Sequence, residues 1–175
     1  YASDMTRTFP VDRKYSETEL ELANLVLKSK ETAVAMLKPG VRYRDVNKAS
    51  RAVFEQAGLA QFYTHAVGHH VGLDVHDPYA DILEKGMVVT IEPGLYIPRG
   101  APVDPRYWDL GIRIEDTYVI TETGARAITV YDQIPYLVTE SEPEVEAVAP
   151  EEKLEGIADP GTGETETEET QVDPD

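Results

Sequence analysis

The spacing of apolar residues changes once along this chain, and the change limits the folds that it can adopt. Before Gly58 the apolar residues recur every three to four positions, which is the period of a helix packed on one face. From Met87 onward, β-branched residues run together or alternate with polar residues, as they do in strands. Helices followed by strands predict an α+β fold, in which the helices cover the outer face of a curved antiparallel sheet.

Two helices are expected in the first part of the chain. Ser16 and Glu19 form a Ser-x-x-Glu capping box, which predicts a helix that runs to about Leu37. A second helix is expected from about Arg44 to Ala57, with Gly58 as its C-terminal stop. Neither helix carries a group that suggests chemistry, so both are interpreted as scaffold.

The strands are expected further along the chain. The predicted strands cover residues 87–91, 95–97, 111–120 and 127–131, and a turn at Thr123-Gly124 joins the last two.

The net charge of −17 is unevenly distributed. Residues 141–175 hold 13 acidic residues and one basic residue, which predicts an acidic, disordered tail after a domain of residues 1–140. The domain itself is only mildly acidic, which argues against nucleic acid as a partner. The sequence has no cysteine and no apolar run long enough to span a membrane, so no membrane partner is expected and a cytoplasmic location is predicted.

Carboxylates interrupt the predicted strands. Glu92 ends the apolar run 88–91, Glu115 and Asp116 break the pattern of 111–120, and Asp4 lies in a strand-like stretch at the beginning of the chain. A carboxylate that faces inward from a strand is costly unless a cation or several donors satisfy it. For each acid taken alone, the alternative is an arginine partner, such as Arg113 for Glu115.

The four histidines lie within twelve residues, which core packing does not explain. If the segment is extended, His65 and His69 lie on one face and His76 points to the other. Gly68 and Gly72 permit a close approach of the backbone to a ligand. A zinc-binding histidine loop is the alternative, but the chain has neither a cysteine partner nor a helical His-x3-His pair with a glutamate.

Three separated motifs resemble those of the pita-bread metallopeptidases, which include aminopeptidase P and prolidase. The motifs are Ser-Asp-Met-Thr-Arg-Thr-Phe-Pro at 3–10, the histidine segment 65–77, and Glu-Pro-Gly-Leu-Tyr at 92–96 with Gly-Ile-Arg-Ile-Glu-Asp at 111–116. They follow one another in the family's order, although Ala66 stands where the family usually has glycine. The resemblance implies the pita-bread fold.

The resemblance also implies roles for individual residues. It makes Asp4, His69, Glu92 and Glu115 metal ligands, with Asp4 and Glu115 bridging two ions. His65 and His76 match histidines that face the substrate, and the catalytic group is expected to comprise His65, His76, Glu92 and Arg113.

The family uses a further aspartate about ten residues before the position of Asp4, and this sequence starts too late to contain it. We therefore expect an N-terminally incomplete domain in this stretch. It should bind one ion better than two and show little cleavage by itself.

The predicted activity is metal-dependent hydrolysis of the Xaa-Pro bond at peptide N-termini, through a metal-activated water. Three carboxylates and an imidazole form a hard site that suits Mn²⁺, with Co²⁺, Fe²⁺ or Zn²⁺ as alternatives. The resemblance implies two Mn²⁺ ions in the full-length protein. The expected partner is a peptide with proline in its second position, and the protein is a monomer or a homo-oligomer. A Xaa-Pro dipeptidase (prolidase) and a non-catalytic pita-bread interaction module are the alternative functions.

Overall fold

The computed structural model describes residues 1–134. The predicted acidic tail, 141–175, lies outside these residues, as do the last residues of the predicted domain. Within the described residues, no helix is both long and apolar enough to cross a membrane.

Both predicted helices are confirmed. Helix α1 spans Glu17–Val34, and the capping box at its start is complete, because the Ser16 hydroxyl accepts from the Glu19 N–H and the Glu19 carboxylate accepts from the Ser16 N–H. It ends three residues before the predicted Leu37. Helix α2 spans Tyr43–Gln56. Gly58 follows with φ of +70°, a left-handed conformation that glycine adopts without strain.

The strands form two antiparallel groups. Strands β1 (Val88–Ile91), β4 (Asp116–Ile120) and β5 (Ala125–Ala127) make one group, and β2 (Gly94–Ile97) pairs with β3 (Leu110–Arg113) in the other. Two 3-10 helices, Ala60–Phe62 and Pro105–Tyr107, lie in the connections.

Two strand predictions are corrected. The predicted single strand 111–120 is divided into β3 and β4 at residues 114–115. The strand expected at 127–131 lies at β5 instead, because the tight turn after Ile120 brings Ala125 directly opposite Ile120.

The two groups nevertheless belong to one long ladder. Ile91 pairs with Asp116 and Gly94 pairs with Arg113, so the strands keep one register across the interruption. In that register Glu92 lies opposite Glu115. The ladder is therefore interrupted where the two predicted glutamate ligands face each other.

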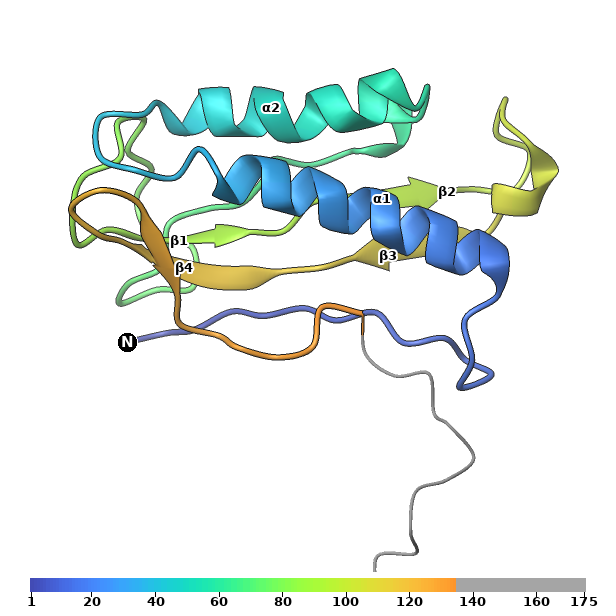
Figure 1. Cartoon of the computed structure of the whole chain (residues 1–175), viewed down its shortest axis with the longest axis horizontal. Coiled ribbons are helices and arrows are strands. Elements are labelled where there is room, and N and C mark those ends of the chain that lie inside the picture. Colours follow the sequence, from blue (N-terminus) through green and yellow to red (C-terminus); the bar gives the residue numbers. More distant parts are fainter. Residues whose placement is uncertain (135–175) are drawn as a thin grey trace, which may run out of the picture. The chain divides into compact units, whose positions relative to one another are not determined.

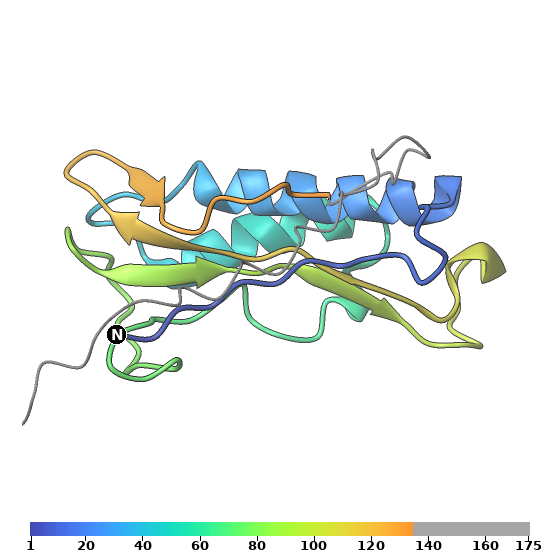
Figure 2. The same ribbon diagram turned by 90° about the horizontal axis from the view of Figure 1, so that it is seen from below.

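Two further segments extend the ladder at its edges. Residues 67–71 run antiparallel to β1. The Val71 N–H donates to the Val88 carbonyl, the Thr90 N–H to the His69 carbonyl, and the Glu92 N–H to the Val67 carbonyl. On the other side, Thr6 forms an antiparallel bridge with Glu115. Figure 2 shows this N-terminal segment running beside the strands.

The helices cover one face of the strands, as Figure 1 shows. Leu22 and Val26 of α1 pack with Leu95 and Ile112 of β2 and β3 in one core cluster. A second cluster joins α2 to β1 and β4 through residues such as Val46, Val89 and Ile120. The predicted α+β arrangement, with helices on one side of an antiparallel sheet, is confirmed.

Candidate metal centre

Alternation along the strands places the two glutamates on the face that the helices leave free. Val89 and Ile91 point into the helical core, so Glu92, one residue further, points to the opposite face. Ile114 lies in the core in the same way, and Glu115 follows it. Since like charges directly opposite on paired strands destabilise a sheet, this arrangement requires a compensating charge.

His69 and Asp4 complete a row across four neighbouring segments. The His69 Nε2 atom lies 3.5 Å from an Asp4 carboxylate oxygen and 3.4 Å from a Glu92 carboxylate oxygen. Ligand atoms of Asp4, His69 and Glu115 lie within 4.8 Å of one another. The structure therefore brings all four predicted ligands together, one from each of four adjacent chain segments.

The electrostatics of the row fit a cation. Glu115 is 1% exposed, and its Oε2 atom accepts a hydrogen bond of 2.6 Å from the Thr6 hydroxyl. Its Oε1 atom is buried and has no hydrogen-bond partner among the described residues. A buried carboxylate oxygen without a donor is costly, and a metal ion would satisfy it. The donor set of three carboxylates and one imidazole suits a hard divalent ion.

The glutamates also hold their protons more tightly than usual. Burial raises the pKa of Glu115, and the negative charges of Glu92 and Asp4 raise it further against the hydrogen bond from Thr6. Burial likewise raises the pKa of Glu92, which His69 and Arg113 oppose. Burial is the largest cause of both shifts, and the neighbouring carboxylates add to it.

His65 lies on the same free face at the level of β2. Its Nε2 atom is 2.9 Å from the Tyr96 hydroxyl, and its ring contacts the Tyr63 ring edge-on with centroids 5.3 Å apart. Tyr96 lies two positions beyond Gly94 on the face that carries Glu92. The histidine is thus oriented by a phenol that the sequence reasoning did not single out.

The predicted orientation of His76 is wrong. The chain is not extended after Val71, because the Asp77 N–H donates back to the His70 carbonyl and the Gly72 N–H to the Asp74 carbonyl. This chain reversal brings the exposed His76 ring next to the His69 ring, with the two ring centroids 4.0 Å apart. His76 therefore lies beside the row of ligands instead of pointing away.

His70 has the contacts of a residue that stabilises the fold. It is buried, its Nε2 atom lies 2.9 Å from the Ala80 carbonyl oxygen, and its ring packs edge-on against Tyr43.

Arg113 lies next to the row without an ion pair to Glu115 among the described residues. Its Nε–H donates to the Thr6 hydroxyl at 3.3 Å, the same hydroxyl that donates to Glu115. The arginine pairing considered as an alternative for the strand acids is found at Asp116, which Arg7 binds at 2.8 Å. Asp116 faces the helical side and is separate from the row.

Two threonines support the ligands and were missed from the sequence. Thr6 donates to Glu115, and the Thr90 hydroxyl accepts the His69 N–H at 3.0 Å and lies 3.3 Å from Glu92. The available signal was strand alternation, which places Thr90 on the same face as Glu92.

Gly68 permits the close approach of the histidine segment to β1. A Cβ atom at this position would lie 2.3 Å from the Thr90 carbonyl oxygen and 2.6 Å from the Tyr43 hydroxyl. We expect Gly68→Ala to lower the free energy of unfolding by about 1–3 kcal/mol, because the main chain must shift. Urea denaturation measures the loss. Gly124→Ala is the matched control, since its nearest contact is at 3.9 Å, and an equal loss there would contradict the prediction.

The carboxylates and the histidine clustered on the free face of the sheet form a candidate metal site of the kind that metal-dependent hydrolases use. Residues 1–122 match the model of metallopeptidase family M24, and the chain belongs to this family. The family implies a divalent metal, in agreement with the donor set.

The relatives include an Xaa-Pro aminopeptidase and an Xaa-Pro dipeptidase. The Xaa-Pro aminopeptidase of Haemophilus influenzae is 40% identical over 153 residues, covering 74% of this chain and 36% of that protein. The Xaa-Pro dipeptidase of Pyrococcus furiosus is 37% identical over 135 residues, covering 74% and 36%. Proline aminopeptidase P II from Yersinia pestis superposes with a TM-score of 0.69 at 34% identity, covering 76% and 37%.

These relatives confirm the predicted pita-bread fold. The chain spans about a third of the length of the curated relatives that it matches.

Proposed function

We propose that this chain forms the metal-binding part of a peptidase that hydrolyses the Xaa-Pro bond at peptide N-termini. The observation that carries the proposal is the facing pair Glu92 and Glu115, flanked by His69 and Asp4. One Glu115 oxygen is buried and has no hydrogen-bond partner within residues 1–134. The names of the relatives support the substrate class. A cytoplasmic location and a homo-oligomeric state stay predictions.

The proposed ligands are Asp4, His69, Glu92 and Glu115. Divalent metal ions held there would polarise the scissile carbonyl and lower the pKa of water. The hard donor set suits Mn²⁺, with Co²⁺, Fe²⁺ and Zn²⁺ as alternatives. The family resemblance implies two such ions in the full-length protein, and Asp4 and Glu115 would then serve both.

The chain's own groups then handle the proton and the substrate. Glu92 would accept the proton of the attacking water, as a carboxylate beside the reacting groups can. His65, oriented by Tyr96, and the exposed His76 beside His69 would bind the peptide. Arg113, within reach of the Thr6 hydroxyl, would place positive charge beside the reacting carbonyl.

A proline amide offers no N–H, so recognition depends on its carbonyl and its ring. Histidines that bind the carbonyl oxygen suit this substrate, and the edge-on Tyr63 ring gives His65 an apolar neighbour. The dipeptidase alternative has the same support from a relative, and substrate length separates the two activities.

The test is hydrolysis by the full natural chain that carries this sequence, with added Mn²⁺. We expect cleavage of a Xaa-Pro-Xaa tripeptide and not of the matched Xaa-Ala-Xaa tripeptide. Glu92→Gln should lower kcat at least 100-fold, because general base catalysis contributes about 10²–10⁴-fold. Glu122→Gln is the control, since Glu122 pairs with Lys85 at the surface.

Three outcomes separate the alternatives. Cleavage of Xaa-Pro alone, without tripeptide cleavage, would identify a dipeptidase. No cleavage together with no Mn²⁺ binding would indicate an interaction module. A Glu92→Gln variant as active as the wild type would overturn the role of Glu92.

A further inference from the structure

Arg7 is a buried arginine whose five N–H groups are all used. Its side chain is 5% exposed. The five acceptors are the main-chain oxygens of Thr6 (2.9 Å), Glu115 (2.5 Å), Tyr131 (3.1 Å) and Asp132 (2.6 Å), and a carboxylate oxygen of Asp116 (2.8 Å). A fully satisfied, planar guanidinium fixes the positions of its partners in a way that a flexible ammonium does not.

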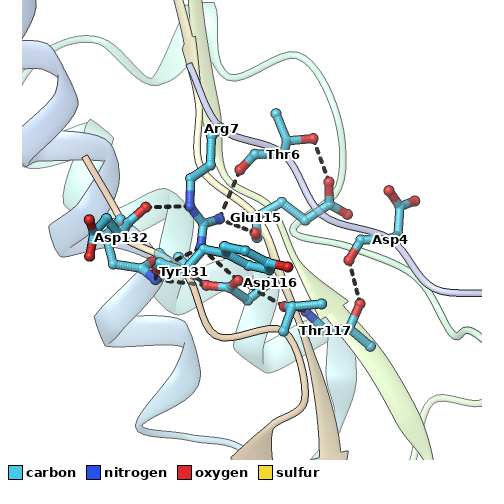
Figure 3. A network of polar contacts seen from close by, with 11 residues as sticks. Asp4, Thr6, Arg7, Glu115, Asp116, Thr117, Tyr131 and Asp132 are labelled. Atoms are coloured by element: carbon cyan, nitrogen blue, oxygen red, sulfur yellow. Dashed lines mark hydrogen bonds and ion pairs between the residues drawn. The ribbon is translucent and has the colours of Figure 1, made fainter. Parts of the chain in front are cut away.

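One nitrogen of Arg7, Nη1, binds both chain segments that carry the proposed metal ligands Asp4 and Glu115. Nη1 donates both to the Thr6 carbonyl and to the Glu115 carbonyl, and the Thr6 carbonyl also accepts the Glu115 N–H at 3.0 Å. Asp4 is two residues before Thr6, and its carbonyl accepts from the Thr117 hydroxyl at 2.6 Å. Figure 3 shows Arg7 beside the main chain of Glu115, with the carboxylates of Glu115 and Asp4 on the other side.

Asp116 binds the Arg7 guanidinium and is itself held by three other side chains. Asp116, which accepts from Arg7, also accepts from the Lys30 ammonium, the Thr129 hydroxyl at 2.8 Å and the Gln133 amide at 3.0 Å. The segment 129–133 therefore contacts the network twice, through these side chains and through the carbonyls that Arg7 binds. These contacts hold the Arg7 guanidinium in place.

We propose that Arg7 is a positioning residue for the metal centre, which sets the separation of the Asp4 and Glu115 carboxylates by fixing the main chain beneath them. The inference rests on the proposed function. Repulsion between the carboxylates would push these segments apart, and metal coordination requires ligand positions held within about 0.5 Å. The main chain at Thr6 and Glu115 must therefore resist that repulsion.

The test compares Arg7→Met and Arg7→Lys with the wild type, using the 175-residue chain. Calorimetry measures Mn²⁺ affinity, and the visible spectrum of added Co²⁺ reports ligand geometry. We expect both variants to bind Mn²⁺ about 10–100-fold more weakly, the range for residues that orient metal ligands, and the Co²⁺ bands to shift. Lys30→Met is the matched control, because it removes a buried cation from Asp116 without touching Thr6 or Glu115. It should lower stability and leave the affinity of the folded protein within about twofold of the wild type.

Each result has a defined meaning. If Arg7→Met does not fold, Arg7→Lys tests the inference, because lysine keeps the positive charge and loses the planar guanidinium with its five N–H donors. Wild-type affinity and an unchanged Co²⁺ spectrum in a folded Arg7 variant would overturn the inference and leave the proposed function intact. An equal loss of affinity in Lys30→Met would also overturn it, because the effect would then be one of general stability. A wild-type chain that binds no Mn²⁺ would overturn the proposed function, and the inference with it.

Discussion

Asp116→Ala is expected to lower the free energy of unfolding by about 3–5 kcal/mol, which is the cost of leaving buried charges without their partner. The side chains of Arg7, Lys30 and Asp116 are 5%, 3% and 2% exposed, so water cannot replace the lost contacts. Thr129 and Gln133 would lose an acceptor as well. Urea denaturation at neutral pH measures the loss.

Surface ion pairs provide the comparison. Glu122→Ala breaks the exposed pair with Lys85 and should change the unfolding midpoint very little, since exposed pairs contribute little to stability. A similarly small change in Asp116→Ala would show that the buried network does not hold the N-terminal segment and β4 together.

Unfolding at low pH should also report how much the contacts of Asp116 contribute to stability. Burial acts to raise the pKa of Asp116, but hydrogen bonds from Lys30, Arg7 and Gln133 lower it below its usual value. A carboxyl group whose pKa is lower in the folded state stabilises the protein above its unfolded-state pKa of about 3.9, and this contribution is lost as the pH falls through the folded-state value. In Asp116→Ala this part of the acid transition should disappear.

The helices were predictable because their signals are local. The capping box of Ser16 and Glu19 and the stop at Gly58 lie within or next to the elements that they define. The strand boundaries were less predictable. Glu115 and Asp116 break the apolar pattern of 111–120, but a strand that carries an inward-facing acid gives the same break, so the sequence does not show that the ladder opens at Glu115.

The metal centre depends on contacts that no local pattern contains. The hydrogen bond between Thr6 and Glu115 joins residues 109 positions apart, and the register that faces Glu92 with Glu115 is a property of the folded sheet. Resemblance to a family brought these residues together before the structure did. His76 was placed on the wrong face because one assumption, an extended chain, failed at the reversal after Val71. Arg7 was missed because its role is carried by main-chain carbonyls, which every residue has.

Glu115→Gln is expected to separate stability from function. In the metal-free protein at neutral pH the change should raise the free energy of unfolding by about 1 kcal/mol, because it removes a buried charge that faces Glu92. The amide keeps an oxygen for the Thr6 hydroxyl. Its NH₂ group can donate to the Asp4 carboxylate, which lies within the same 4.8 Å cluster. Urea denaturation in the presence of a chelator measures the gain.

The pKa of Glu115 determines how the stability of the metal-free protein changes with pH. The pKa of Glu115 is raised in the folded state, chiefly by burial. A raised carboxyl pKa contributes stability below the unfolded-state value of about 4.3, and this contribution is lost as the pH rises through the folded-state value. The metal-free wild type should therefore lose stability between pH 4 and neutrality relative to Glu115→Gln, and the two curves should converge in acid.

Metal should reverse the order of the two proteins. Mn²⁺ at 100 times its dissociation constant stabilises a one-site protein by about 2.7 kcal/mol, and we expect the wild type to gain this amount with one ion bound. Glu115→Gln loses a charged ligand, so its affinity should fall by at least the 10–100-fold seen for outer-shell changes, and it should gain little. A Glu115→Gln variant that is less stable than the wild type without metal, and equally stabilised by Mn²⁺, would mean that Glu115 is a structural residue. The opposite result would mean that the folded chain tolerates an unfavourable pair of glutamates because the metal requires both.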